Sequence, residues 1–85
     1  MQLDIIIFND NGRFFRFNKK GEQYICDVCY WYGLLYKRED GTWSAEIKQK
    51  YDPFEHYISE EPLASQNDGM RWITSRLIKK ETGHS

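Results

Sequence analysis

Residues with high strand propensity fill the first part of the chain, and three short polar segments that end in glycine interrupt them. The segments are 9–12, 18–21 and 38–41. Such segments are typical of hairpin loops, because glycine adopts a left-handed backbone conformation at little steric cost. We therefore predict antiparallel strands over about residues 2–8, 13–17, 22–37 and 42–51. The third strand is unusually long, and Gly33 is expected to mark a bend or a bulge in it.

The length of each hairpin loop determines which side chains share a face of the sheet, because a shift of one residue exchanges the two faces. We expect three-residue loops at all three turns, so that odd-numbered residues lie opposite odd-numbered residues throughout. The predicted core face is then the odd one, and it carries Leu3, Ile5, Ile7, Phe15, Phe17, Ile25, Cys29, Trp31, Leu35, Trp43, Ala45 and Ile47.

Beyond Tyr51 the pattern changes: Asp52-Pro53 breaks the sheet, 54–58 is a possible fifth strand, and a polar loop follows. A helical period predicts a helix over about residues 68–81, with Asn67 or Asp68 as its cap and Gly83 at its end. Its apolar side carries Met70, Ile73, Thr74 and Leu77. The expected fold is a single α+β domain over 1–85, an antiparallel four- to five-stranded β-meander with this C-terminal α-helix packed on its odd face.

The even-numbered strand residues include many aromatic side chains, among them Tyr24, Tyr30, Tyr32 and Tyr36, accompanied by the cations Arg16 and Lys48. One short helix cannot cover both faces of a sheet, so this second face needs another cover. Three possibilities remain open. The segment 54–58 folds back over the face, two copies associate through it, or it binds another macromolecule.

The helix has a tryptophan on the side opposite its apolar residues. Trp72 projects there near Arg76 and Lys79, so it either contacts the acidic loop before the helix or anchors a partner. The predicted binding residues are therefore Tyr24, Tyr30, Tyr32, Tyr36, Arg16, Lys48, Trp72, Arg76 and Lys79.

No pattern of residues points to a catalytic, metal or cofactor site. Cys26 and Cys29 have the spacing of one metal-binding cysteine pair, but a zinc site needs further ligands and the chain has no other cysteine. His56 has no nucleophile at a recognisable spacing, and the glycines do not form a phosphate-binding loop. We predict that the protein is not an enzyme.

The charge balance and the lack of targeting patterns limit the partner classes. The net charge is −1, which provides no overall field for a polyanion. No stretch has the pattern of a membrane span or a signal peptide, so a cytoplasmic protein with reduced thiols is expected. The predicted function is binding of a protein partner, or of a second copy as a homodimer, and the small size fits an accessory or inhibitory protein of a mobile element. The alternative is single-stranded nucleic-acid binding through sheet aromatics and Lys or Arg.

Overall fold

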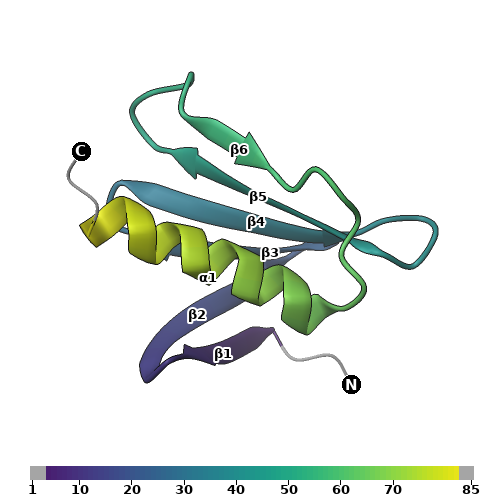
Figure 1. Ribbon diagram of the computed structural model, residues 1–85. Helices are drawn as coiled ribbons and strands as arrows, with labels where there is room; N and C mark the ends of the chain where they lie inside the picture. The colour runs from purple at the N-terminus through teal and green to yellow at the C-terminus, as the bar shows by residue number, and fades with distance from the viewer. Residues whose placement is uncertain (1–3, 83–85) are drawn as a thin grey trace.

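The computed structural model describes residues 4–82, which form six strands followed by one helix. The strands are β1 (Ile5–Asp10), β2 (Arg13–Lys20), β3 (Gln23–Val28), β4 (Trp31–Lys37), β5 (Trp43–Gln49) and β6 (His56–Ile58), and the helix is α1 (Gln66–Thr82). Each strand pairs with its neighbours in sequence, and α1 lies across one face of the resulting antiparallel sheet (Figure 1). The predicted fold class is confirmed, although the described residues contain six strands rather than four or five. Leu3 and Gly83 lie outside the described residues.

The additional strand arises because the segment 22–37, predicted as one strand, is two strands joined by a tight turn. Val28 pairs with Trp31, which leaves only Cys29 and Tyr30 in the loop. Cys29 has a φ of 51°, a left-handed conformation that is uncommon outside Gly, Asn and Asp. No typical turn residue therefore marks this hairpin in the sequence.

The first two hairpin loops contain two residues rather than the predicted three. Asp10 pairs with Arg13 across Asn11 and Gly12, whose φ values of 53° and 90° are those of a type I′ turn. The β2–β3 loop is equally short, since Lys20 pairs with Gln23. These tight loops match the right-handed twist of the strands that they join.

The loop between β4 and β5 has the predicted form. The Arg38 N–H donates to the Thr42 carbonyl oxygen at 2.7 Å, which leaves three residues between them. Gly41, the last of the three, has a φ of 90°, where an L side chain would be strained. This loop keeps odd residues opposite odd residues between β4 and β5.

Each two-residue loop places odd-numbered residues opposite even-numbered ones, so the buried face changes parity along the chain. The all-odd core face is correct for β2, β4 and β5 and wrong for β1 and β3. The buried apolar side chains of the sheet are Phe8, Phe15, Phe17, Tyr24, Cys26, Leu35, Ala45 and Ile47. Ile5, Ile7 and Ile25, all predicted for the core face, instead lie on the opposite face.

The helix buries the side that its periodicity predicts: Met70, Ile73, Thr74 and Leu77 are all buried. It begins earlier than expected, because Ser65 rather than Asn67 or Asp68 caps it. The Ser65 hydroxyl oxygen accepts a hydrogen bond from the Asp68 N–H at 3.1 Å, which satisfies one of the free donors of the first turn.

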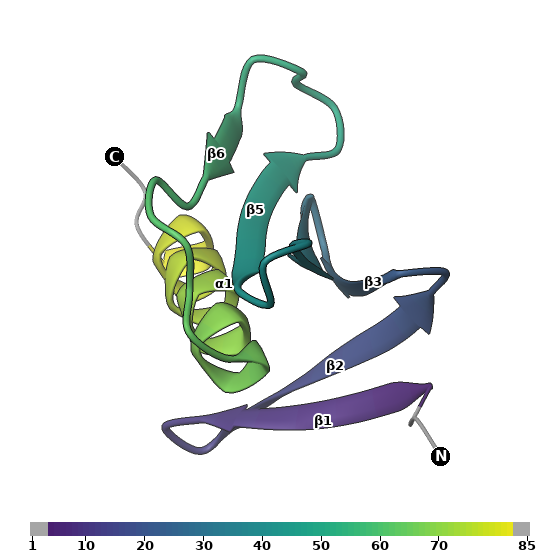
Figure 2. The ribbon, with the colours of Figure 1, turned by 90° about the vertical axis from the view of Figure 1, so that its right-hand side faces the viewer.

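Two glycines let the helix approach the sheet closely. A Cβ atom at Gly33 would lie 2.3 Å from Cγ2 of Ile73, and one at Gly69 would lie 2.3 Å from Cδ1 of Leu35. Gly33 therefore marks neither a bend nor a bulge; it pairs regularly with Cys26 and leaves room for the helix. The sheet is strongly twisted around this contact, so that β1 and β2 lie below α1 rather than behind it (Figure 2).

Candidate interaction surface

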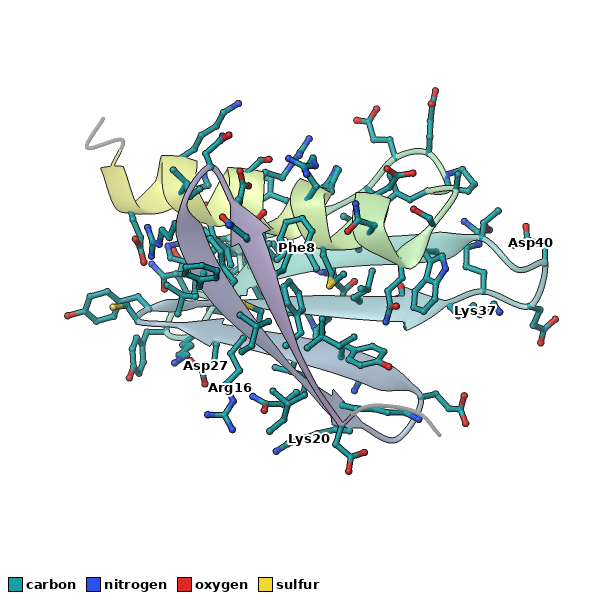
Figure 3. The ribbon with its side chains drawn as sticks, turned by 90° about the horizontal axis from the view of Figure 1, so that it is seen from below. Phe8, Arg16, Lys20, Asp27, Lys37 and Asp40 are labelled. Atoms are coloured by element: carbon teal, nitrogen blue, oxygen red, sulfur yellow. The ribbon has the colours of Figure 1, made fainter. Side chains whose placement is uncertain are left out.

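The side of the sheet that faces away from α1 is the main candidate for a functional surface, and we call it the outer face. Residues directly opposite each other on paired strands point to the same side, so the register defines its members. They are Ile5, Ile7, Asn9, Phe14, Arg16, Asn18, Lys20, Gln23, Ile25, Asp27, Tyr32, Leu34, Tyr36, Ser44, Glu46, Lys48, His56 and Ile58. Figure 3 shows Arg16 and Asp27 pointing away from α1, whereas Phe8 points toward it.

The outer face has an apolar centre and an exposed apolar end. Leu34 lies directly between Ile25 and Glu46, and it is half-buried together with Tyr32 and Tyr36. Toward β1 and β2 the apolar side chains are more exposed: Ile7 is 58% exposed and Phe14 is 67% exposed. No described element packs over this side of the sheet, since α1 contacts the opposite face.

The segment 54–58 does not fold back over the outer face. Of the three possibilities for covering this face, association of two copies and binding of another macromolecule therefore remain. Residues 56–58 form β6, which pairs with β5 and extends the sheet sideways. Phe54, expected to fold back, is 94% exposed in the loop before β6.

Most cations near the centre of the outer face are paired with carboxylates. Glu46, only 8% exposed, lies 3.7 Å from the Lys48 ammonium nitrogen and 3.4 Å from Nε2 of His56. The Lys50 ammonium group forms an ion pair with Asp27. Arg16 and Lys20, both on β2, have no carboxylate partner among residues 4–82. The free positive charge is therefore at one end of the face.

The predicted tyrosine surface is divided by the actual register. Tyr32 and Tyr36 lie on the outer face with Arg16 and Lys48. Tyr24 does not: it is 8% exposed and packs in the core on the helix side. Tyr30 lies in the turn after β3, where its ring meets that of Tyr51 edge to face at a centroid distance of 6.0 Å. The candidate surface thus loses Tyr24 and keeps Tyr30 only at its margin.

The helix residues predicted for binding form a separate surface. Trp72 is half-buried, and the Arg76 guanidinium group stacks on its ring at 3.9 Å. Burial lowers the pKa of Arg76, which remains charged. Lys79 is exposed one turn further along α1.

Trp72 and Arg76 also line a pocket beneath the loop that precedes the helix. The pocket has a volume of about 440 Å³, and its other walls include Tyr57, Glu61 and Leu63. Trp72 therefore lies beside the acidic loop. Its side chain lines this pocket, and its ring also contacts the Arg76 guanidinium group.

The cysteines occupy very different environments. Cys26 is buried in the core, where desolvation, with a smaller effect of the Asp27 charge, raises its pKa to about 12. Cys29 is exposed in the turn. Within the described part of the chain, no cluster of three or more His, Cys, Asp or Glu side chains is arranged to hold a metal ion.

The sequence interpretation missed the exposed apolar residues of β1. It assigned Ile5 and Ile7 to the core and did not include them in the binding surface. The dipeptide Asn11-Gly12 carried the missing signal, because Asn-Gly strongly favours the two-residue type I′ turn. With a two-residue turn, Phe8 lies on the face that α1 covers and Ile7 lies on the outer face.

Across residues 4–82, no helix combines the length and the apolar character that are needed to span a bilayer. Comparisons with models of protein families, with curated proteins and with solved structures returned no match to this chain.

Proposed function

We propose that this protein is a non-enzymatic interaction module that binds a protein partner through the outer face of its sheet. The observation that carries the proposal is the apolar strip formed by Tyr32, Leu34 and Tyr36, on a side of the sheet that no described element covers. Ile7 and Phe14 add exposed apolar side chains at the β1 end of the same face, on the far side of the polar β2 residues Asn18 and Arg16. Apolar and aromatic surface that is left uncovered is typical of protein interfaces.

The composition of the face suits a protein better than a nucleic acid. Interface centres are enriched in aromatic residues and depleted of free charge, and here Lys48 shares the carboxylate of Glu46 with His56. A single-strand binder needs cations beside its stacking rings to follow the phosphates. On the outer face, Arg16 and Lys20 have no carboxylate partner among the described residues, and both lie on β2, two strands away from the tyrosines of β4.

Site-specific photo-crosslinking in the cells that express the protein tests the proposal. Benzoylphenylalanine in place of Tyr36 puts a reactive aromatic group on the outer face. The matched control places the same group at Phe54, which is an exposed aromatic residue off the face. We expect a discrete protein adduct from position 36 that is absent from position 54.

A second experiment introduces a charge on the outer face by substitution. Leu34→Asp, combined with the crosslinker at position 36, should abolish the adduct while circular dichroism shows an intact fold. Equal labelling from positions 36 and 54, or an adduct that consists of nucleic acid and disappears at high salt, would refute the proposed function.

A further inference from the structure

Strand β1 is an edge of the sheet, and its free side presents backbone hydrogen-bonding groups. In an antiparallel ladder, alternate residues bond to the partner strand while the residues between them point outward. The Lys19 N–H donates to the Asp4 carbonyl oxygen at 2.7 Å, so the even-numbered residues of β1 bond to β2. Ile5, Ile7 and Asn9 therefore direct their N–H and C=O groups away from the sheet. No described residue satisfies them.

This edge lacks the features by which proteins normally block strand pairing. Such features are proline, lysine, a β-bulge or a very short strand. Residues Ile5 to Asn9 contain no proline or charge, and β1 pairs with β2 without a bulge over all six of its residues. The opposite edge is different, because β6 has only three residues and is followed by Glu60 and Glu61.

We propose that β1 pairs antiparallel with β1 of a second copy of this chain, so that two sheets join edge to edge about a twofold axis. The axis passes between the two Ile6 residues, which places Ile5 opposite Ile7 of the partner subunit. In this register the outward N–H and C=O groups of Ile5 and Ile7 meet those of the other copy. The ladder continues the sheet across the dimer.

Charge and shape favour a second copy as the occupant of this edge. In the proposed register Asp4 lies opposite Phe8 of the partner subunit, so no like charges meet. Two copies of β6 would instead bring their acidic loops together. Ile7, which is 58% exposed in one copy, would be covered by an isoleucine of the other.

The inference concerns the edge of β1 rather than the outer face, and it stands whether or not that face binds a protein. The two proposals also fail separately, because one is tested by adducts at position 36 and the other by the association of the purified chain with itself.

Sedimentation equilibrium of the purified chain over a dilution series from about 1 mM to about 1 μM tests the pairing. We expect the mass of two chains at the high end and of one chain after dilution. Ile7→Pro removes an outward N–H that β2 does not use, and Ile7→Lys adds a charge at the junction; both should give the mass of one chain throughout. Phe14→Lys is the matched control, since Phe14 is also exposed, at 67%, but belongs to β2, which is not an edge strand, and it should associate like the original chain.

Amide hydrogen exchange by NMR gives a readout that does not depend on a substitution. The Ile5 and Ile7 amides should exchange at least about tenfold more slowly at the high concentration than at the low one, because the second copy supplies their acceptors. A mass of one chain at every concentration, or loss of association in Phe14→Lys as in the Ile7 variants, would overturn the inference.

Discussion

Thr74 on α1 donates a hydrogen bond of 2.6 Å from its hydroxyl group to a carboxylate oxygen of Asp10 at the end of β1. Both residues are buried, and 64 positions separate them in the sequence. The bond fixes the first hairpin to the helix although the helix packs mainly against β4 and β5. It also provides the partner that a buried carboxylate requires.

Thr74→Val is expected to lower the free energy of unfolding by about 1–3 kcal/mol, because it leaves the buried Asp10 carboxylate without this donor while keeping the side-chain shape. Urea denaturation measures the change. Ser75→Ala is the control, since the Ser75 hydroxyl donates to the Arg71 carbonyl oxygen on the helix surface. It should change stability by no more than about 0.5 kcal/mol. Equal effects of the two substitutions would show that the Asp10 contact adds no stability.

Gly33→Ala should destabilise the fold by about 1–3 kcal/mol, because its Cβ would collide with Ile73. The atom that it meets is attached directly to the branched Cβ of a fully buried side chain, so it cannot rotate away. Gly69→Ala should cost less, since alanine favours a helix by about 1 kcal/mol and the Leu35 methyl is at the end of its side chain. Thermal unfolding of both variants checks the order. A Gly33→Ala protein as stable as the original would contradict the close helix–sheet contact.

Thiol labelling at pH 8 should modify Cys29 quickly and Cys26 only after unfolding. With a pKa of about 12 the buried Cys26 would be about one part in ten thousand thiolate at that pH, and its burial also blocks the reagent. Mass spectrometry should find one label per folded chain and two in denaturant. In Cys29→Ser the folded protein should remain unlabelled. Rapid labelling of Cys26 in that variant would contradict its placement in the core.

Much of the fold could be predicted from the sequence because its signals are local. The glycine-ended segments locate three of the hairpins, and the period of Met70, Ile73 and Leu77 identifies the buried side of α1. The loop at Gly41 was predicted with the correct length. These features depend on neighbouring residues, for which propensity and period are informative.

The turn at Cys29 and Tyr30 could not be predicted in the same way. Neither residue favours a positive φ, and the surrounding apolar residues resemble one continuous strand. The turn is followed by a strand that places Gly33 beneath Ile73 and Leu35 against Gly69, which are contacts between distant parts of the sequence that local propensity does not report. The wrong face for Tyr24 has another source, because the β2–β3 loop contains two residues rather than three and so turns Tyr24 to the helix side.

Two tyrosines on opposite faces should respond differently to truncation. Tyr24→Ala is expected to lower the free energy of unfolding by about 3 kcal/mol, because it opens a cavity in the core beneath α1. Tyr36→Ala, on the half-buried outer face, should cost about 1 kcal/mol. Denaturant titration of the two variants at matched concentrations checks the difference. A larger loss from Tyr36→Ala would reverse the assignment of the faces.

The central claim is that the β3–β4 turn places Tyr32, Leu34 and Tyr36 on the face that α1 leaves open. Proton–proton Overhauser contacts in the NMR spectrum of the purified protein test it most directly. We expect strong contacts from the Gly33 α-protons and the Leu35 methyls to Ile73 and Met70, and none from the rings of Tyr32 or Tyr36 to α1. Contacts between either of those rings and Ile73 would contradict the claim and the function proposed from it.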